Sequence, residues 1–301
     1  MPDLRDMELL SALARHGHFA RAAEACGISQ PAFSARIRNL EHALGVAVVK
    51  RGNRYHGLTR EGEIALAWAR KMLADLEGLR QDIDEAKGAL EGQLTLGAVP
   101  SALSYAARVP VLLRAVHPRL VIRILSASST EIRAGLEDYS FDAGLTYLDI
   151  ERPAASRVEP IYAERYVLLV PAALAPRAAG EASWAEAAAL PLALLTPNMR
   201  NRRILDEAFA AAGVSARPVM ESNTFTTALL QVTAGVAATI APEVLASAFT
   251  LSGETVALPL VAPRIETPVG LVTLERAPEP PAVRALRAVL SGGVRPSRSA
   301  P

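Results

Sequence analysis

Several features that would place the chain in a familiar class are missing from its sequence. It holds one cysteine in 301 residues, which excludes a disulfide within the chain. No apolar run reaches about 18 residues, the length that a bilayer-spanning helix needs. No secretory signal peptide is expected either. These absences predict a cytosolic chain without a membrane partner, and its 50% apolar content is enough for two or three globular units.

Catalytic patterns are missing as well. The sequence contains no GxSxG, HExxH, P-loop or GxGxxG motif. Four of the five histidines lie between His16 and His56, and the fifth, His117, is interpreted as a cap at a helix end. Cys26 has no second cysteine as a resolving partner, so we interpret it as a small core side chain rather than a redox sensor. We therefore expect no enzyme, no cofactor and no metal site.

The formal net charge is only +1, but the charge is unevenly distributed. Between Arg15 and Arg60 eight lysines and arginines stand against two acidic residues, a local charge of +6. A segment with this balance can neutralise the phosphates of a nucleic acid.

The same segment predicts a helix-turn-helix. A helix of small residues from Phe19 to Cys26 is expected to stop at Gly27. A second helix is expected to start at Ser29, whose hydroxyl can cap the helix. Pro31 is tolerated in the first turn of this helix. Apolar residues then recur every three or four positions, one face of a helix that stops at Gly45. They are Phe33, Ile37, Leu40 and Leu44.

The motifs of this segment resemble a known family. RAAE at 21–24, ISQPAFS at 28–34, LEHALG at 40–45, KR at 50–51 and LTREG at 58–62 follow one another in this order. From about Leu4 to Gly62 the sequence is similar to the DNA-binding domain of LysR-type transcriptional regulators. The resemblance implies a winged helix-turn-helix on double-stranded operator DNA and a small-molecule effector. It also implies a homodimer or homotetramer, with RNA polymerase as a further candidate partner.

Two sets of residues are expected to touch DNA. Short polar groups on the exposed half of the second helix can reach base edges, and basic groups around them can hold phosphates or enter the minor groove. The resemblance assigns Arg51 to a β-hairpin wing over residues 50–57, for which a solvated basic turn is the alternative. The base-reading set is Gln30, Pro31 and Ser34, and the backbone-holding set is Ser29, Arg36, Arg38, Arg51 and Arg54.

A heptad pattern follows the wing. Thr59 is expected to cap a long helix whose apolar residues are spaced alternately by four and three, as in a coiled-coil seam. We interpret residues 61–92 as a linker helix that dimerises, and the alternative is a helix packed on its own domain. The seam consists of Ala65, Ala69, Met72, Leu76, Leu79, Ile83, Ala86 and Leu90.

After residue 92 short strand-like and helical runs alternate, which is βαβ periodicity. The runs 141–145 and 233–242 resemble the two-lobed, periplasmic-binding-protein-like effector domain of the same family. The fold class is therefore α+β multidomain, with a winged helix-turn-helix (1–60), the linker helix (61–92), an effector domain (93–290) and a flexible tail (291–301). One lobe is expected at about 93–161 plus 266–290 and the other at about 162–265.

The expected effector site lies where turns from both lobes can face each other at the carboxyl ends of strands. Helix starts after Ala98 and Leu195 offer free N–H groups, and Arg200, Arg202 and Arg203 add positive charge, so a small organic acid or oxoanion is expected. A plain helix cap is the alternative for any single serine or threonine. The candidate residues are Val99, Pro100, Ser101, Ser128, Ser129, Thr146, Thr196 and Asn198.

Two functions from different classes fit this organisation. One is a DNA-binding transcriptional regulator modulated by a small-molecule effector. The other is an α/β solute-binding or enzymatic protein with an N-terminal interaction module. The expected absence of a signal peptide and of catalytic motifs favours the regulator.

Overall fold

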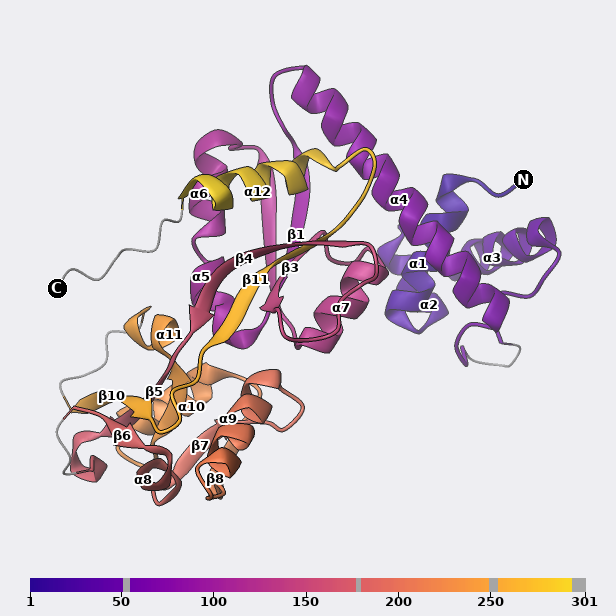
Figure 1. Cartoon of the computed structure of the whole chain (residues 1–301). Helices are drawn as coiled ribbons and strands as arrows, with labels where there is room; N and C mark the ends of the chain where they lie inside the picture. The colour runs from indigo at the N-terminus through magenta and orange to yellow at the C-terminus, as the bar shows by residue number, and fades with distance from the viewer. Residues whose placement is uncertain (51–54, 177–179, 249–253, 294–301) are drawn as a thin grey trace. The chain divides into compact units, whose positions relative to one another are not determined.

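The computed structural model describes residues 1–50, 55–176, 180–248 and 254–293 (Figure 1). It contains two compact units. The first comprises residues 1–92 with the short segments 138–140 and 278–281, and the second comprises most of the remainder. Within the described ranges no helix has both the length and the apolar character of a bilayer-spanning segment.

The first unit begins with the predicted helix-turn-helix and its supporting helix. Asp3 and Asp6 form a capping box at the start of α1. The Ser29 hydroxyl accepts a hydrogen bond from the Ala32 N–H at the start of α3, and Gly45 ends α3 in the left-handed conformation at φ 71°. The helices are α1 (Leu4–His16), α2 (Phe19–Ala25), α3 (Gln30–Leu44) and α4 (Arg60–Ala86).

One apolar core holds these helices together. Phe33, Ile37 and Leu40 are buried as predicted, whereas Leu44, expected on the same face, is 40% exposed. The core also takes in Leu66 and Ala69 from the first half of α4. The start of α4 therefore belongs to the first unit and shares its core with α3.

The junction between the wing and α4 is tightly packed. Thr59 caps α4 by accepting the Gly62 N–H at 2.9 Å, and its hydroxyl donates to the Ala47 carbonyl at 2.6 Å. A Cβ atom at Gly62 would lie 2.0 Å from the Val48 carbonyl oxygen, so only glycine fits there. This explains the glycine of the LTREG motif.

The apolar stripe of α4 differs from the predicted seam. Ala69, expected to face a second copy, is buried in the core of its own unit because α4 packs on α1 there. Met72, Leu79 and Ile83 of the predicted seam are exposed, as are two large side chains outside it, Ile64 and Trp68. The exposed stripe therefore lies beside the predicted one in the first half of the helix and shares Met72, Leu79 and Ile83 with it. The helix ends at Ala86, before the predicted end at residue 92, and the last predicted seam residue, Leu90, lies beyond it and is buried.

The second unit has two lobes, each built on its own sheet. The first lobe carries a five-stranded sheet in the order β2-β1-β3-β11-β4, in which β1 and β3 are parallel and β11 is antiparallel to both of its neighbours. Its elements are β1 (Gly92–Ala98), η1 (Pro100–Ala102), α5 (Leu103–Ala106), α6 (Val109–Val116), β2 (Leu120–Ser126), α7 (Ser129–Glu137), β3 (Ala143–Tyr147), β4 (Ser156–Glu164), β11 (Thr267–Leu274) and α12 (Pro281–Gly293).

The second lobe carries a four-stranded sheet in the order β6-β10-β5-β9, and a bridge between Leu192 and Ala238 connects it to the pair β7-β8. Its elements are β5 (Tyr166–Pro171), η2 (Ala172–Leu174), β6 (Ala182–Ser183), α8 (Trp184–Ala188), β7 (Leu192–Leu195), α9 (Arg200–Ala211), β8 (Pro218–Ser222), α10 (Phe225–Thr233), β9 (Thr239–Pro242), α11 (Glu243–Ala248) and β10 (Thr255–Val261).

The chain crosses between the lobes twice, from β4 to β5 and from β10 to β11 (Figure 1). The first crossing falls at Arg165, a few residues after the predicted boundary, because β4 belongs to the first lobe's sheet. At the other end, α12 extends to Gly293 and so includes the start of the predicted tail, whose remaining residues 294–301 lie outside the described part of the chain.

Candidate DNA-binding surface and effector site

The exposed face of α3 holds the residues that we expected to read bases. Gln30 and Pro31 are exposed and Ser34 is partly buried. Arg38 is also exposed and, in the described part of the chain, has no ion pair. Ser34, Arg38 and Lys50 line one groove between α3 and the wing. The exposed side chains of this face are accessible to a ligand as large as a DNA duplex.

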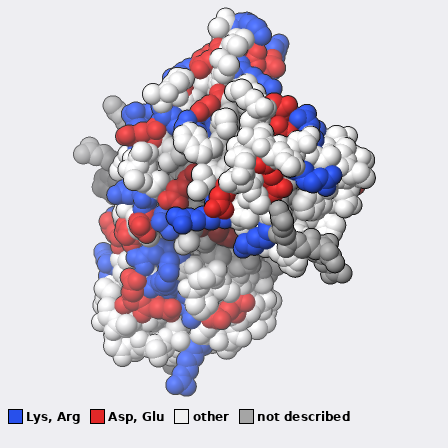
Figure 2. Space-filling model, turned by 90° about the vertical axis from the view of Figure 1, so that its right-hand side faces the viewer, with Lys and Arg blue, Asp and Glu red and all other residues white. Residues whose placement is uncertain are grey.

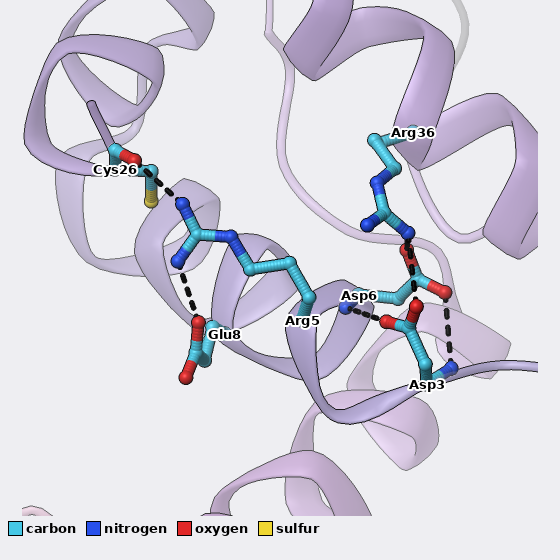
Figure 3. Close-up of polar contacts among 6 residues, drawn as sticks. All are labelled: Asp3, Arg5, Asp6, Glu8, Cys26 and Arg36. Carbon is cyan, nitrogen blue, oxygen red and sulfur yellow. Dashed lines mark hydrogen bonds and ion pairs between the residues drawn. The ribbon is translucent and has the colours of Figure 1, made fainter. Parts of the chain in front are cut away.

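Arg36 points away from that face, toward the start of α1 (Figure 3). Its guanidinium lies 3.1 Å from an Asp3 carboxylate oxygen and 2.8 Å from an Asp6 oxygen. The hydrogen bond with Asp3 is the main cause of the raised pKa of Arg36. Arg36, expected to hold a phosphate, forms an ion pair that ties α3 to α1 in this structure.

The wing is attached to α3 by a residue that the sequence reasoning did not select. The Glu41 carboxylate accepts the backbone N–H groups of Val48 at 2.8 Å and Val49 at 3.1 Å. Its place directly after Leu40 in the LEHALG motif was the available signal. The wing strands pair at Val49 and Leu58, and the predicted contacts Arg51 and Arg54 lie outside the described residues.

In the second unit, three of the candidate effector residues from the first lobe form side-chain hydrogen bonds at the ends of β1, β2 and β3. The Thr146 hydroxyl donates to the Ser129 hydroxyl at 3.1 Å, and the Ser101 hydroxyl lies 2.8 Å from the phenol oxygen of Tyr147. Ser128 caps α7, with its N–H donating to Glu131 at 2.7 Å, which is the alternative considered from the sequence. Val99 and Pro100 are buried beside Ser101.

The second-lobe candidates are not joined to this group by a hydrogen bond among the described residues. Thr196 donates to Asn198 at 2.7 Å, and its N–H donates to the Ser222 carbonyl. Asn201, which the sequence reasoning missed, makes the connection instead, because its side-chain amide donates to the Tyr147 hydroxyl at 3.4 Å.

Two of the three arginines expected to attract an acid, Arg200 and Arg202, are paired with carboxylates. Arg200 contacts Asp149 at 2.5 Å and Glu207 at 2.8 Å. Burial alone would lower the pKa of Arg200, but the hydrogen bonds to these two carboxylates leave it raised. Figure 2 likewise shows basic and acidic side chains interspersed on the face that it draws.

Arg202 contacts Asp206 at 2.9 Å and Glu221 at 2.5 Å. The turn after β1 opens only a three-residue 3-10 helix and a four-residue α-helix, too short for a strong dipole. Two of the three arginines and the turn after β1 therefore lend less support to an acid or oxoanion as effector than expected, and the start of the twelve-residue α9 keeps its free N–H groups.

A carboxylate occupies the junction of the two lobes. Glu164, the last residue of β4, is 0% exposed. It accepts hydrogen bonds from the phenols of Tyr147 at 3.1 Å, Tyr166 at 3.3 Å and Tyr162 at 3.4 Å, and from the Ser101 hydroxyl. Burial raises the pKa of Glu164 to about 7, against the opposing effect of these donors.

Comparison with known proteins decides the family. Residues 4–63 match the model of the bacterial regulatory helix-turn-helix protein of the lysR family, and residues 87–294 match that of the LysR substrate binding domain. The chain belongs to the LysR family of transcriptional regulators. The resemblance read from the motifs of residues 4–62 is confirmed.

Curated relatives of this LysR-family chain are regulators by name. A probable hydrogen peroxide-inducible genes activator of Streptomyces viridosporus is 32% identical over 56% of this chain and 54% of its own length. The SDS degradation transcriptional activation protein of a Pseudomonas strain is 45% identical over 33% of each chain. The first of these alignments spans about half of the relative. These relatives are named as regulators and not as enzymes, as we expected from a sequence without catalytic motifs.

Solved structures share the fold over almost the whole chain. A full-length OxyR variant from Pseudomonas aeruginosa has a TM-score of 0.76 and 25% identity, covering 96% of this chain and 95% of that one. Full-length CbnR in complex with its target DNA has a TM-score of 0.70 and 20% identity, covering 97% and 100%. These neighbours confirm the predicted fold class.

One difference separates this LysR-family chain from a thiol-based sensor. Its single cysteine, Cys26, is partly buried against the helix-turn-helix core in the first unit. A reversible thiol switch within one chain needs a second cysteine as partner. The second unit contains none, so a cysteine pair cannot be its sensing group.

Proposed function

We propose that this LysR-family protein acts in the cytosol as a transcriptional regulator. Its first unit binds double-stranded operator DNA through α3 and the wing, and its second unit binds a small-molecule effector that changes operator binding or promoter activation. The observation that carries the proposal is the exposed, unpaired set of Gln30, Pro31 and Arg38 on a capped helix that α1 and α4 support.

The contact residues that we propose follow from their exposure. Gln30, Pro31 and Ser34 face base edges, and Ser29 and Arg38 hold the backbone. Arg51 and Arg54 remain proposed wing contacts by their place in the basic turn. We leave Arg36 out of the set because its guanidinium is bound to Asp3 and Asp6.

Fluorescence anisotropy with the DNA upstream of the protein's own gene tests this function. The native chain is expected to bind that DNA more tightly than a shuffled sequence. Arg38→Ala should weaken binding to both by roughly tenfold, because a phosphate contact is lost. Arg203→Ala is the matched control, since Arg203 is an exposed arginine of the second unit without an ion pair in the described part of the chain. Equal affinity of the native chain for both DNAs would refute operator recognition.

We also propose that the protein is a dimer that pairs through α4, with a tetramer assembled through the second units. Supporting this, an apolar groove of about 700 Å³ lies along α4 and is lined by Met7, Leu44, Ile64, Trp68 and Met72 among others. Burying such a surface against a second copy is favourable.

Sedimentation tests this association. Ile83→Glu, at a side chain 46% exposed on the same helix, is expected to give smaller species because it places two like charges in the interface. Val121→Glu, which changes an exposed valine of β2 instead, should leave the α4 dimer intact. An unchanged oligomer in the Ile83 variant would place self-association elsewhere. RNA polymerase contact is a further proposed step of promoter activation.

A further inference from the structure

The groove between α3 and the wing has a volume of about 720 Å³ and two walls. One wall is a face of α3, on which Ser34, Arg38 and His42 follow one another at spacings of four and so form a row along the helix. The other wall is the stretch of residues 46–50 that leads into the wing and ends in Lys50. The groove therefore runs from a base-reading residue of α3 to the wing.

Both walls of this groove carry hydrogen-bond donors. Arg38, His42 and Lys50 are exposed, and none of them has an ion pair in the described part of the chain. Lysine and arginine side chains hold phosphate oxygens, and an imidazole donates through one N–H even when it is neutral. Glu41 is the one acidic side chain among the described residues that line the groove, and its carboxylate is bound to backbone N–H groups. The polar side chains without a partner there can therefore all donate to an anion.

Glu41 ties the two walls of the groove together. Its Oε1 atom accepts the N–H of Val48 at 2.8 Å and the N–H of Val49 at 3.1 Å. On the opposite side the Thr59 N–H donates to the Val48 carbonyl at 3.0 Å, next to the start of α4. Among the described residues, Glu41 makes the only side-chain hydrogen bonds from α3 to this wall. Its carboxylate therefore sets the position of Lys50 relative to α3.

The shape of B-DNA determines what a groove in this place can hold. A major groove and the minor groove beside it are separated by one sugar–phosphate strand. This step rests on the proposed function, in which α3 enters a major groove and the wing lies over the adjacent minor groove. The DNA strand that separates the two must then pass between α3 and the wing. Its phosphates would face Arg38 and His42 on one side and Lys50 on the other.

We propose that His42 and Lys50 are further phosphate-binding residues, which hold one DNA strand in this groove, and that Glu41 is a positioning residue which sets the width of the groove. His42 binds the strand from α3, beside Arg38, and Lys50 binds it from the wing. These contacts add affinity without base preference, because phosphates carry no sequence information. Glu41 acts through the N–H groups of residues 48 and 49 and not through DNA.

Fluorescence anisotropy with two duplexes tests the phosphate contacts. The duplexes are the DNA upstream of the protein's own gene and a shuffled sequence of the same composition. Lys50→Met should weaken binding to both about tenfold at about 0.1 M salt and lower the salt slope by about one ion. His42→Ala should weaken binding to both about threefold, since one hydrogen bond is lost. Lys71→Met, the same change at an exposed lysine of α4 outside the groove, should bind like the native chain.

Two replacements test the role of Glu41 in the same assay. Glu41→Gln keeps an oxygen that can accept the same two N–H groups and removes a negative charge, so it should bind both duplexes as tightly as the native chain or up to about threefold more tightly. Glu41→Ala removes the acceptor and should bind both about tenfold more weakly. In the Glu41→Ala chain, Lys50→Met should then cost less than about twofold, because Lys50 is no longer held against the DNA strand. A loss of stability alone would leave that cost at about tenfold.

Two results would overturn this assignment and leave operator binding intact. One is native affinity and salt slope in both the Lys50→Met and the His42→Ala chain, on duplexes that the native chain binds. The other is an equal cost of Lys50→Met with and without Glu41, which would remove the positioning role. A native chain that binds neither duplex would instead refute the proposed function, and the groove contacts with it.

Discussion

On the recognition helix, Gln30 and Arg38 extend into solvent and bind nothing else in the described part of the chain. At the lobe junction of the second unit, Glu164 and Tyr147 are buried and use almost every donor and acceptor they have. Both regions are rich in polar groups. They differ in whether the protein itself satisfies those groups.

The free-energy cost of binding a ligand therefore differs between the two regions. An exposed side chain gives up water to meet DNA, and the protein's own fold is unchanged. A buried network must exchange one set of hydrogen bonds for another, so a ligand acts there only by shifting the balance between two arrangements. The first unit can therefore be rigid while the second responds.

The largest expected loss of stability comes from a tightly packed position in the first unit, the unit whose polar side chains are mostly free. Gly62→Ala should destabilise the DNA-binding unit by about 3 kcal/mol or more, since the new Cβ would lie 2.0 Å from the Val48 carbonyl oxygen. Urea unfolding measures it. Gly78→Ala on the same helix is the control, because nothing lies within 4 Å of its Cβ position, and it should stabilise by about 1 kcal/mol. Equal effects of the two changes would show that the wing junction is loosely packed.

The two regions should also differ in how much stability is lost when one polar group is removed. Tyr147→Phe removes one oxygen that contacts Glu164, Ser101 and Asn201, and should destabilise the second unit by about 2 kcal/mol. Gln30→Ala removes a polar group from the recognition helix and should change stability by less than about 0.5 kcal/mol. Chemical unfolding of both variants tests the contrast. A Tyr147→Phe chain as stable as the native one would mean that the junction is not a cooperative network.

The fold of the first unit could be predicted because its signals are local. Ser29 caps α3, Gly45 ends it, and Phe33 and Leu40 are buried at helical spacing. Gly45 ends the helix through its own left-handed conformation at φ 71°, and a capping side chain contacts only the first turn of its helix. Such features are independent of the rest of the chain. The side of α4 that faces the core is not local, which is why the predicted seam includes the buried Ala69.

The second unit was predicted less completely for the same physical reason. The apolar run over residues 102–116 alone predicts one helix, but Pro110 cannot be placed in the middle of a helix, and the structure has α5 and α6 on either side of residues 107–108. The strand β4 was missed because Pro160 interrupts its pattern, and it is tolerated since β4 is an edge strand. Glu164, at the end of that strand, could not be found without it. Its partners outside β4 come from three other elements, η1, β3 and β5, that only the tertiary fold brings together.

A smaller effect separates two arginines two positions apart on α3. Arg38→Met should reduce the salt dependence of operator binding by about one ion. Arg36→Met should leave that slope unchanged and lower the stability of the first unit by less than about 1 kcal/mol, since its ion pairs are partly exposed. Anisotropy titrations at several salt concentrations distinguish them. A lower slope in the Arg36 variant would return that residue to the DNA-binding set.

The smallest effect concerns pH in the first unit. The pKa of Asp3 is lowered, first by the hydrogen bond from the Asp6 N–H and then by Arg36. A carboxylate with a lowered pKa adds stability above its ordinary value near 3.8, and that stability is lost as the pH falls through the lowered value. Asp3→Asn keeps a capping side chain but removes the charge. Its unfolding midpoint should therefore lie slightly below that of the native chain at about pH 6, and the difference should shrink as the pH falls below the ordinary value near 3.8. Glu24→Gln, at an exposed acidic residue of α2, is the matched control. If the Asp3 difference grew on acidification, its carboxylate would not be the group that holds Arg36.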